Sequence, residues 1–87
     1  MTDGLIVVAG AGGFIGGHLV GDLLKQGHKV RAVDIKPFDE WHQRHPAAED
    51  KRLDLSLKEA CDIAARGASQ IYNLAADKQT SADVVPL

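Results

Sequence analysis

An apolar run that breaks into a glycine-rich turn lies near the start of the chain. Residues 7–16 read Val-Val-Ala-Gly-Ala-Gly-Gly-Phe-Ile-Gly. Gly10 allows a tight turn at the end of a strand, Gly13 allows a ligand to approach the backbone, and Gly16 allows a helix to lie close to the sheet. The unpaired N–H groups at the start of such a helix favour a negatively charged group. The pattern therefore predicts a βαβ unit that binds the pyrophosphate of a dinucleotide.

The spacing of these glycines is Gly-x-x-Gly-x-x-Gly, whereas the dehydrogenase fingerprint is Gly-x-Gly-x-x-Gly, whose last glycine would fall on Ile15. Glycine-rich turns also have purely structural uses, so the turn alone does not decide the function. Residues further along the chain are needed to distinguish the two uses.

An acidic residue ends the next apolar segment. Residues 30–33 read Val-Arg-Ala-Val and are followed by Asp34. A carboxylate at the end of the second strand can accept hydrogen bonds from both ribose hydroxyls of an adenosine, and it repels the 2′-phosphate of NADP. The pattern favours NAD as the cofactor, although Lys36 reduces that repulsion. The alternative is that Asp34 is an ordinary solvated residue at a strand end.

Length, charge and cysteine content limit the class of protein. The chain has 87 residues, which is at most one domain and too short for a complete doubly wound sheet of six strands. A net charge of −2 argues against a nucleic-acid partner. Cys61 is the only cysteine, so no intrachain disulfide forms and a cytoplasmic location is favoured. No segment has the pattern of a signal peptide or membrane helix, so we expect no membrane partner.

The periodicity of apolar residues predicts the order of elements. Residues 35–50 contain two prolines and no clear period, so we expect a surface excursion with one helical turn around Trp41. Ser56 and Glu59 fit a capping box that opens a second helix. Gly17 and Gly21 have no evident reason to lie in the first helix. The expected elements are strands at 5–9, 29–34, 52–55 and 69–75, and helices at 14–26 and 56–66.

These elements predict an α/β fold that is the first half of a Rossmann fold: a parallel sheet of about four strands in the order 3-2-1-4, with two or three helices. We expect residues 1–77 to form the NAD-binding unit. Residues 78–87 are expected to be a tail or the start of a continuation.

Several short motifs occur together in an order that is typical of one family. They are 9–19 (Ala-Gly-Ala-Gly-Gly-Phe-Ile-Gly-Gly-His-Leu), Gly27-His28, Asp34, Asp54-Leu55 and 73–76 (Asn-Leu-Ala-Ala). In these segments the chain resembles the cofactor-binding half of an extended short-chain dehydrogenase/reductase. Within that group it is similar to nucleotide-sugar epimerases and dehydratases, and residues 14–15 and 73–77 look most like the GDP-mannose 3,5-epimerase branch. The resemblance covers roughly residues 4–77.

The resemblance implies a role for each matching segment. Phe14 and Ile15 would offer backbone N–H groups to the pyrophosphate, Asp34 would bind the adenosine ribose, and 54–55 would flank the adenine. Residues 74–76 would line the side of the pyrophosphate and nicotinamide ribose, although an apolar strand end that packs on a helix has the same appearance. The expected cofactor contacts are Gly10, Gly12, Gly13, Phe14, Ile15, Gly16, Asp34, Ile35, Lys36, Asp54, Leu55, Leu74, Ala75 and Ala76.

The chain also departs from the family's pattern. Ala9 stands where Thr or Ser is usual, and Gly17 stands where Ser is common. The catalytic Tyr-x-x-x-Lys of the family is absent, because Tyr72 is the only tyrosine and Ala76 follows it four residues later. We therefore expect NAD binding without catalytic residues in this chain, as the N-terminal part of an epimerase/dehydratase-like oxidoreductase. The alternative is a non-catalytic nucleotide-binding or protein-interaction module.

Other side chains have less specific interpretations. The two histidines at 42 and 45, near two acidic residues, are interpreted as solvated rather than as metal ligands. Cys61 is expected to be a small core residue. Trp41 either caps an adenine pocket or covers the edge of the sheet, and the second is favoured.

The edge of the predicted sheet suggests association between chains. The strand that contains 71–74 would have unpaired N–H and C=O groups where a fifth strand should lie. We expect a homo-oligomer on this basis, unless residues 78–87 cover that edge.

Overall fold

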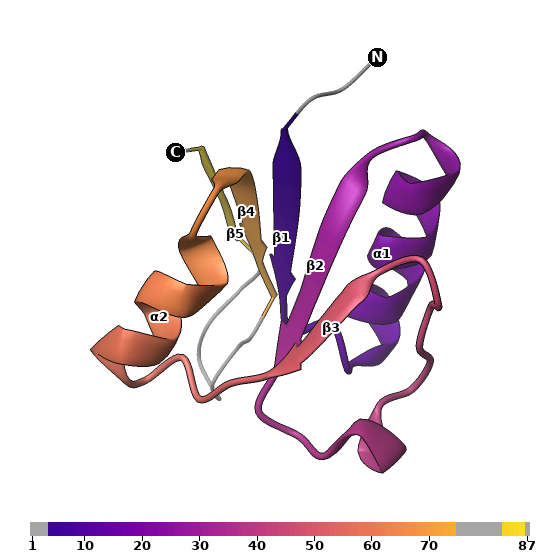
Figure 1. The fold of residues 1–87 in the computed structure, drawn as a ribbon. Helices are drawn as coiled ribbons and strands as arrows, with labels where there is room; N and C mark the ends of the chain where they lie inside the picture. Colours follow the sequence, from indigo (N-terminus) through magenta and orange to yellow (C-terminus); the bar gives the residue numbers. More distant parts are fainter. Residues whose placement is uncertain (1–3, 75–82, 87) are drawn as a thin grey trace.

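The computed structural model describes residues 4–74 and the backbone of residues 83–86. In chain order the elements are β1 (Leu5–Ala9), α1 (Phe14–Lys25), β2 (Lys29–Asp34), a short 3-10 helix (Phe38–Glu40), β3 (Glu49–Arg52), α2 (Lys58–Ala65), β4 (Ala68–Asn73) and β5 (Asp83–Pro86) (Figure 1).

All the strands form one sheet in the order β3-β2-β1-β4-β5. The first four strands are parallel, so their carboxyl ends lie along the same edge of the sheet. Helix α1 covers one face of the sheet and α2 covers the other (Figure 1). The predicted order 3-2-1-4 and the predicted Rossmann-type arrangement are confirmed.

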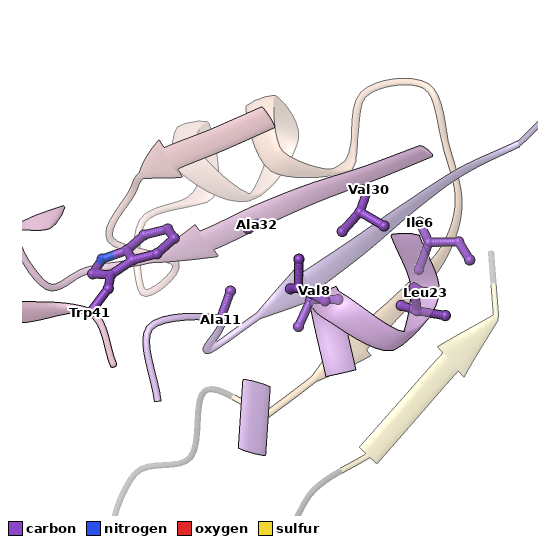
Figure 2. Close-up of a cluster of buried hydrophobic side chains, with 8 residues drawn as sticks. Ile6, Val8, Ala11, Leu23, Val30, Ala32 and Trp41 are labelled. Atoms are coloured by element: carbon purple, nitrogen blue, oxygen red, sulfur yellow. The ribbon is translucent and has the colours of Figure 1, made fainter. Parts of the chain in front are cut away.

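The side chains of β1 point alternately to the two faces of the sheet, and they divide the buried core into two clusters. Ile6 and Val8 face α1 and pack with Val20, Leu23, Val30, Ala32, Ala11 and Trp41 (Figure 2). Val7 faces the side of α2 and packs with Val33 and Ala64. Because both faces of β1 are covered, its sequence is an uninterrupted apolar run rather than an alternating one.

The two unexplained glycines of α1 make room for the loop that precedes β3. A Cβ at Gly17 would lie 2.7 Å from Cγ of Gln43, and one at Gly21 would lie 3.0 Å from Cε1 of His45. The His45 ring nitrogen Nε2 is also 2.9 Å from the carbonyl oxygen of Gly17. The loop therefore packs closely on the helix at both glycines.

Arg31 connects three elements on the face of the sheet that α2 covers. Its Nη1 donates to the carbonyl oxygens of Ile63, Ala64 and Arg66 at 3.2, 2.7 and 2.9 Å, where the end of α2 leaves acceptors without helical partners. Its Nε donates to Oε1 of Glu49 on β3 at 3.0 Å. This hydrogen bond holds the pKa of Glu49 below its usual value. Arg31 thus joins β2, β3 and the end of α2.

The predicted third strand at 52–55 is wrong in its position, because β3 spans Glu49–Arg52. The strand is set by pairing with β2, in which Arg31 lies opposite Glu49 and Asp34 lies opposite Arg52. All four residues of β3 are charged, so no apolar pattern marks it in the sequence.

The predicted capping box is also wrong. Helix α2 begins at Lys58, and no side chain caps its start. Both the backbone N–H and the hydroxyl of Ser56 donate instead to Oδ1 of Asp54, at 3.0 and 2.7 Å. The carboxylate of Asp54 therefore accepts from the Ser56 N–H that would donate to the side chain of Glu59 in a capping box.

The edge beside β4 is occupied. Strand β5 pairs antiparallel with β4, with Val85 opposite Ile71 and Val84 opposite Tyr72. The expectation of an unpaired β4 edge is therefore wrong, and part of the 78–87 segment provides the cover. The prediction of a homo-oligomer loses the basis on which it was made.

Candidate nucleotide-binding site

A cavity of about 740 Å³ lies at the carboxyl ends of the parallel strands and extends beneath α2. It brings together segments that are far apart in the sequence, because the ends of β1, β2, β3 and β4 are neighbours in the sheet. The expected contacts that line it are Gly10, Gly13, Asp34, Ile35, Lys36, Asp54, Leu55 and Leu74.

The other expected contacts fall into two groups. Gly12, Phe14, Ile15 and Gly16 belong to the glycine turn and the first turn of α1, beside the cavity but outside its lining. Ala75 and Ala76 lie outside the described residues.

The glycine turn has a different requirement at each glycine. Gly10 has φ of +87°, which disfavours a side chain. A Cβ at Gly16 would collide with the carbonyl oxygen of Gly10 and lie 2.9 Å from Cα of Ala11, so this glycine keeps α1 against the turn. A Cβ at Gly13 would meet only the oxygen of Gly10, at an ordinary distance of 3.6 Å. The fold does not need a glycine at position 13, whereas a ligand close to the backbone does.

The start of α1 is suited to an anion. Its N-cap is Gly13, no side chain caps the helix, and the first turn has no acidic residue. The N–H groups of the first turn of a helix have no partner within the helix, and the helix dipole favours negative charge there. A phosphate group can accept hydrogen bonds from these donors without competition from a side-chain carboxylate.

Asp34 is held in place by two backbone donors. The N–H of Gly12 donates to its Oδ2 at 2.9 Å, and the N–H of Lys36 donates to its Oδ1 at 3.0 Å. The residue is only 9% exposed, yet it lines the cavity. Each carboxylate oxygen accepts more than one hydrogen bond, so both can still accept from a ligand hydroxyl. A solvated strand end, the alternative interpretation, does not fit this burial.

Gly12 has a role that the spacing of the motif did not indicate. A Cβ at this position would lie 2.9 Å from Oδ2 of Asp34 and 3.0 Å from Cγ of Trp41. Trp41 belongs to the core cluster and does not line the cavity, which argues against its interpretation as the cap of an adenine pocket (Figure 2).

The cavity continues past the end of β3. Asp54 lies there, and its hydrogen bonds from Ser56 hold the pKa of the carboxyl below its usual value. Cys61 lines the same end, and its thiol donates to the carbonyl oxygen of Leu55 at 3.0 Å. Cys61 is exposed, so the prediction of a core residue is wrong. It occupies the face of α2 that is turned toward the cavity.

Sequence reasoning missed several residues of the lining. Ser56, Asn73, Leu53 and Ile71 contribute to it, together with Val7, Ala9, Cys61 and Ala64. Most of these are small or apolar residues that no motif distinguishes from core. At the end of β4, the N–H of Leu74 donates to the carbonyl oxygen of Ala9 at 2.7 Å, which ties this segment to β1. Residues 4–74 and 83–86 contain no group of acidic, His and Cys residues that could hold a metal ion.

The strand order, the glycine turn against α1 and the buried carboxylate at the end of β2 define an α/β protein of the Rossmann type. The profile of the NAD-dependent epimerase/dehydratase family matches residues 6–85. The chain belongs to this family.

Known relatives have different activities. GDP-mannose 3,5-epimerase 1 of Oryza sativa subsp. japonica is 35% identical over 72 residues, which are 83% of this chain and 19% of the relative. A 3 beta-hydroxysteroid dehydrogenase/Delta 5→4-isomerase of Mycobacterium tuberculosis is 36% identical over 73 residues, which are 84% of this chain and 19% of the relative. The chain therefore spans about a fifth of the length of these relatives.

A solved structure agrees with the fold. The UDP-glucose 4-epimerase of Thermus thermophilus in complex with NAD superposes with a TM-score of 0.71 at 29% identity, over 84% of this chain and 24% of that chain. No helix within the described part of the chain is long and apolar enough to cross a membrane.

Proposed function

We propose that the chain binds NAD, with the pyrophosphate at the start of α1 and the adenosine over the ends of β2 and β3. The observation that carries this proposal is the cavity itself. The uncapped helix start, the sterically free Gly13 and the buried carboxylate of Asp34 all border it.

The strand order supports one direction for the proposed ligand along the sheet edge. The glycine turn follows β1, Asp34 ends β2 and Asp54 follows β3, so the three segments succeed one another along the sheet edge. A ligand with its pyrophosphate at the first segment places its ribose at the second and its base at the third. The 54–55 segment then flanks the adenine, and Leu74 lies toward the nicotinamide half.

NAD is the favoured cofactor over NADP. The 2′-phosphate of NADP would lie close to the carboxylate of Asp34 and be repelled by its negative charge. Asp34 is only 9% exposed, and its carboxylate cannot move away without losing two hydrogen bonds. Lys36 lines the same part of the cavity and offsets part of the repulsion.

We further propose that this chain corresponds to the cofactor-binding part of a nucleotide-sugar epimerase/dehydratase-like oxidoreductase that acts in the cytoplasm. NAD supplies such an enzyme with a hydride acceptor. This sequence contains no Tyr-x-x-x-Lys, and Tyr72 lies within β4 rather than on a helix. The chain by itself accordingly binds the cofactor without supplying the general acid–base pair.

Replacing Asp34 by alanine tests the ribose contact. We expect the affinity for NAD to fall about 10- to 100-fold, the typical effect of losing hydrogen bonds to a charged group, while the affinity for NADP changes less than about threefold because a repulsion is lost as well. Isothermal titration of both ligands measures this. Asp39→Ala, on the exposed 3-10 helix, is the control and should change neither.

Two outcomes would contradict the assignment. An equal loss for NAD and NADP would remove Asp34 from its role. If folded wild-type protein binds neither ligand at millimolar concentration, the alternative of a non-catalytic protein-interaction module is favoured.

The isolated chain is expected to show no turnover. General acid–base catalysis typically contributes 10²–10⁴-fold to a rate, and the residues that supply it in the family are absent here. A panel of nucleotide sugars with NAD, followed by absorbance of the reduced cofactor and by product chromatography, should remain at background. Turnover that is stoichiometric with protein and is abolished by Tyr72→Phe would contradict this.

A further inference from the structure

Trp41 contacts residues of the candidate site without lining the cavity. It is the only tryptophan of the chain. Trp41 is buried, with 7% of its surface exposed, and it is not among the residues that line the cavity. A Cβ at Gly12 would lie 3.0 Å from both Cδ1 and Cγ of the indole, so the ring rests directly on the glycine turn. The next residue reinforces this contact, because the N–H of His42 donates to the carbonyl oxygen of Gly12 at 2.8 Å.

The same indole also holds the segment that follows β2. Its Nε1–H donates to the carbonyl oxygen of Lys36 at 2.9 Å. Trp41 therefore contacts two residues, Gly12 and Lys36, and these are the two whose backbone N–H groups donate to the carboxylate of Asp34. The N–H of Gly12 donates to Oδ2 and that of Lys36 donates to Oδ1, so the indole contacts the residues that supply the donors to both oxygens.

We propose that Trp41 is a positioning residue that orients Asp34 for the ribose hydroxyls. This inference rests on the proposed function. By holding Gly12 and Lys36 at once, the indole keeps both backbone donors in place, and the carboxylate keeps one rotamer whose remaining lone pairs face the cavity. A group that is held in its binding geometry before the ligand arrives loses less conformational entropy on binding.

The indole N–H separates this role from simple packing. A phenylalanine at position 41 would keep an aromatic ring beside Gly12 and in the core cluster, but it has no donor for the carbonyl oxygen of Lys36. If Trp41 only fills space, this substitution changes stability alone. If Trp41 positions Asp34, it also changes how strongly the site recognises a ribose hydroxyl.

The test compares two probes of the adenosine half, ADP and 2′,3′-dideoxy-ADP. For the wild-type chain we expect ADP to bind at least about tenfold more tightly, because its hydroxyls donate to a charged acceptor. For Trp41→Phe we expect this ratio to fall to about threefold or less, with the affinity for the dideoxy probe unchanged within about twofold. Isothermal titration gives both affinities, and thermal unfolding establishes that each variant is folded.

Phe38→Leu is the matched control. Phe38 packs edge-to-face against Trp41, with ring centroids 5.2 Å apart, and it is a half-buried part of the same cluster. The substitution removes packing but leaves the indole N–H in place. We expect a lower unfolding temperature and an unchanged ratio of the two affinities.

A second measurement uses the wild-type chain and does not depend on the stability of a variant. The single indole N–H gives one resonance in a ¹⁵N-correlated NMR spectrum. We expect its exchange with solvent to slow at least about threefold with saturating ADP and to stay unchanged with saturating dideoxy-ADP, because only ADP fixes the carboxylate.

The outcomes separate this inference from the proposed function. Failure of folded wild-type protein to bind ADP overturns both. Preferential binding of ADP with the same ratio in Trp41→Phe overturns the positioning role alone. If Trp41→Phe does not fold, an indole exchange rate that responds equally to both probes overturns it.

Discussion

Replacing Gly13 by alanine is expected to weaken NAD binding while leaving the fold intact. Gly13 has φ of −82° and ψ of 174°, which any residue adopts, and a Cβ there meets only an oxygen at 3.6 Å. The stability should therefore fall by only about 1 kcal/mol or less, the usual difference between glycine and alanine at a helix N-cap. The methyl group instead occupies the space between the turn and the pyrophosphate.

We expect the affinity for NAD to fall by about 1–3 kcal/mol, the usual cost of forcing an extra methyl group into a close contact. That is roughly a 5- to 150-fold increase in Kd. Titration calorimetry and thermal unfolding on the same preparation measure both quantities. A folded variant with wild-type affinity would show that the pyrophosphate does not approach Gly13.

Replacing Gly16 by alanine should have the opposite effect and destabilise the fold. The new methyl group would collide with the carbonyl oxygen of Gly10 and crowd Cα of Ala11. These are backbone atoms, which cannot rotate out of the way, so α1 must shift from the turn. Overpacking of this kind costs about 1–3 kcal/mol, of which the better helix propensity of alanine recovers at most about 1 kcal/mol.

A shift of 1 kcal/mol lowers the unfolding temperature of a domain of this size by about 4–8 °C. The neighbouring Gly17→Ala is the control, because its Cβ would meet Cγ of Gln43, a flexible side chain that can move. We expect Gly17→Ala to lower the unfolding temperature less than Gly16→Ala does, because the Gln43 side chain can shift whereas the backbone atoms beside Gly16 cannot. Equal unfolding temperatures for the two variants would contradict the packing role of Gly16.

The two substitutions together test which glycines of the turn are required for packing and which for ligand binding. Gly16 serves the packing of α1 on the turn, whereas Gly13 has no packing role and is proposed to make room for the ligand. A further member, Gly12, serves the contact with Trp41 and Asp34. Sequence spacing alone assigns the same residue type to all three positions and cannot distinguish a requirement of the fold from one of the site.

The best predicted parts of the fold are the buried parallel strands and the first helix. The 5–9 and 29–34 strands have the bounds that the sequence predicts, and α1 ends at Lys25, one residue from the expected end. These elements are bounded by glycines and are buried, so apolar periodicity and chain breakers mark them directly. The order 3-2-1-4 follows from the same elements because crossover connections allow few arrangements.

The parts of the fold that the sequence misplaced or missed depend on contacts with other segments, and no local sequence pattern marks them. Strand β3 consists of charged residues and exists because it pairs with β2, where Arg31 meets Glu49. Strand β5 is defined by its pairing with β4. Ser56 satisfies a capping pattern, but its N–H and hydroxyl donate to Asp54, and the helix begins at Lys58.

The sequence by itself determined the chemistry of the site: a glycine turn before a helix, a carboxylate at the end of the second strand and the family to which they belong. Only the tertiary structure decided which residues meet. It placed Trp41 against Gly12 and Lys36, whose backbone N–H groups donate to Asp34. It also turned Cys61 toward the cavity and packed a distant loop on Gly17 and Gly21. The physical reason is that these contacts join segments distant in the chain, and local patterns encode burial and backbone conformation but not the partner of a side chain.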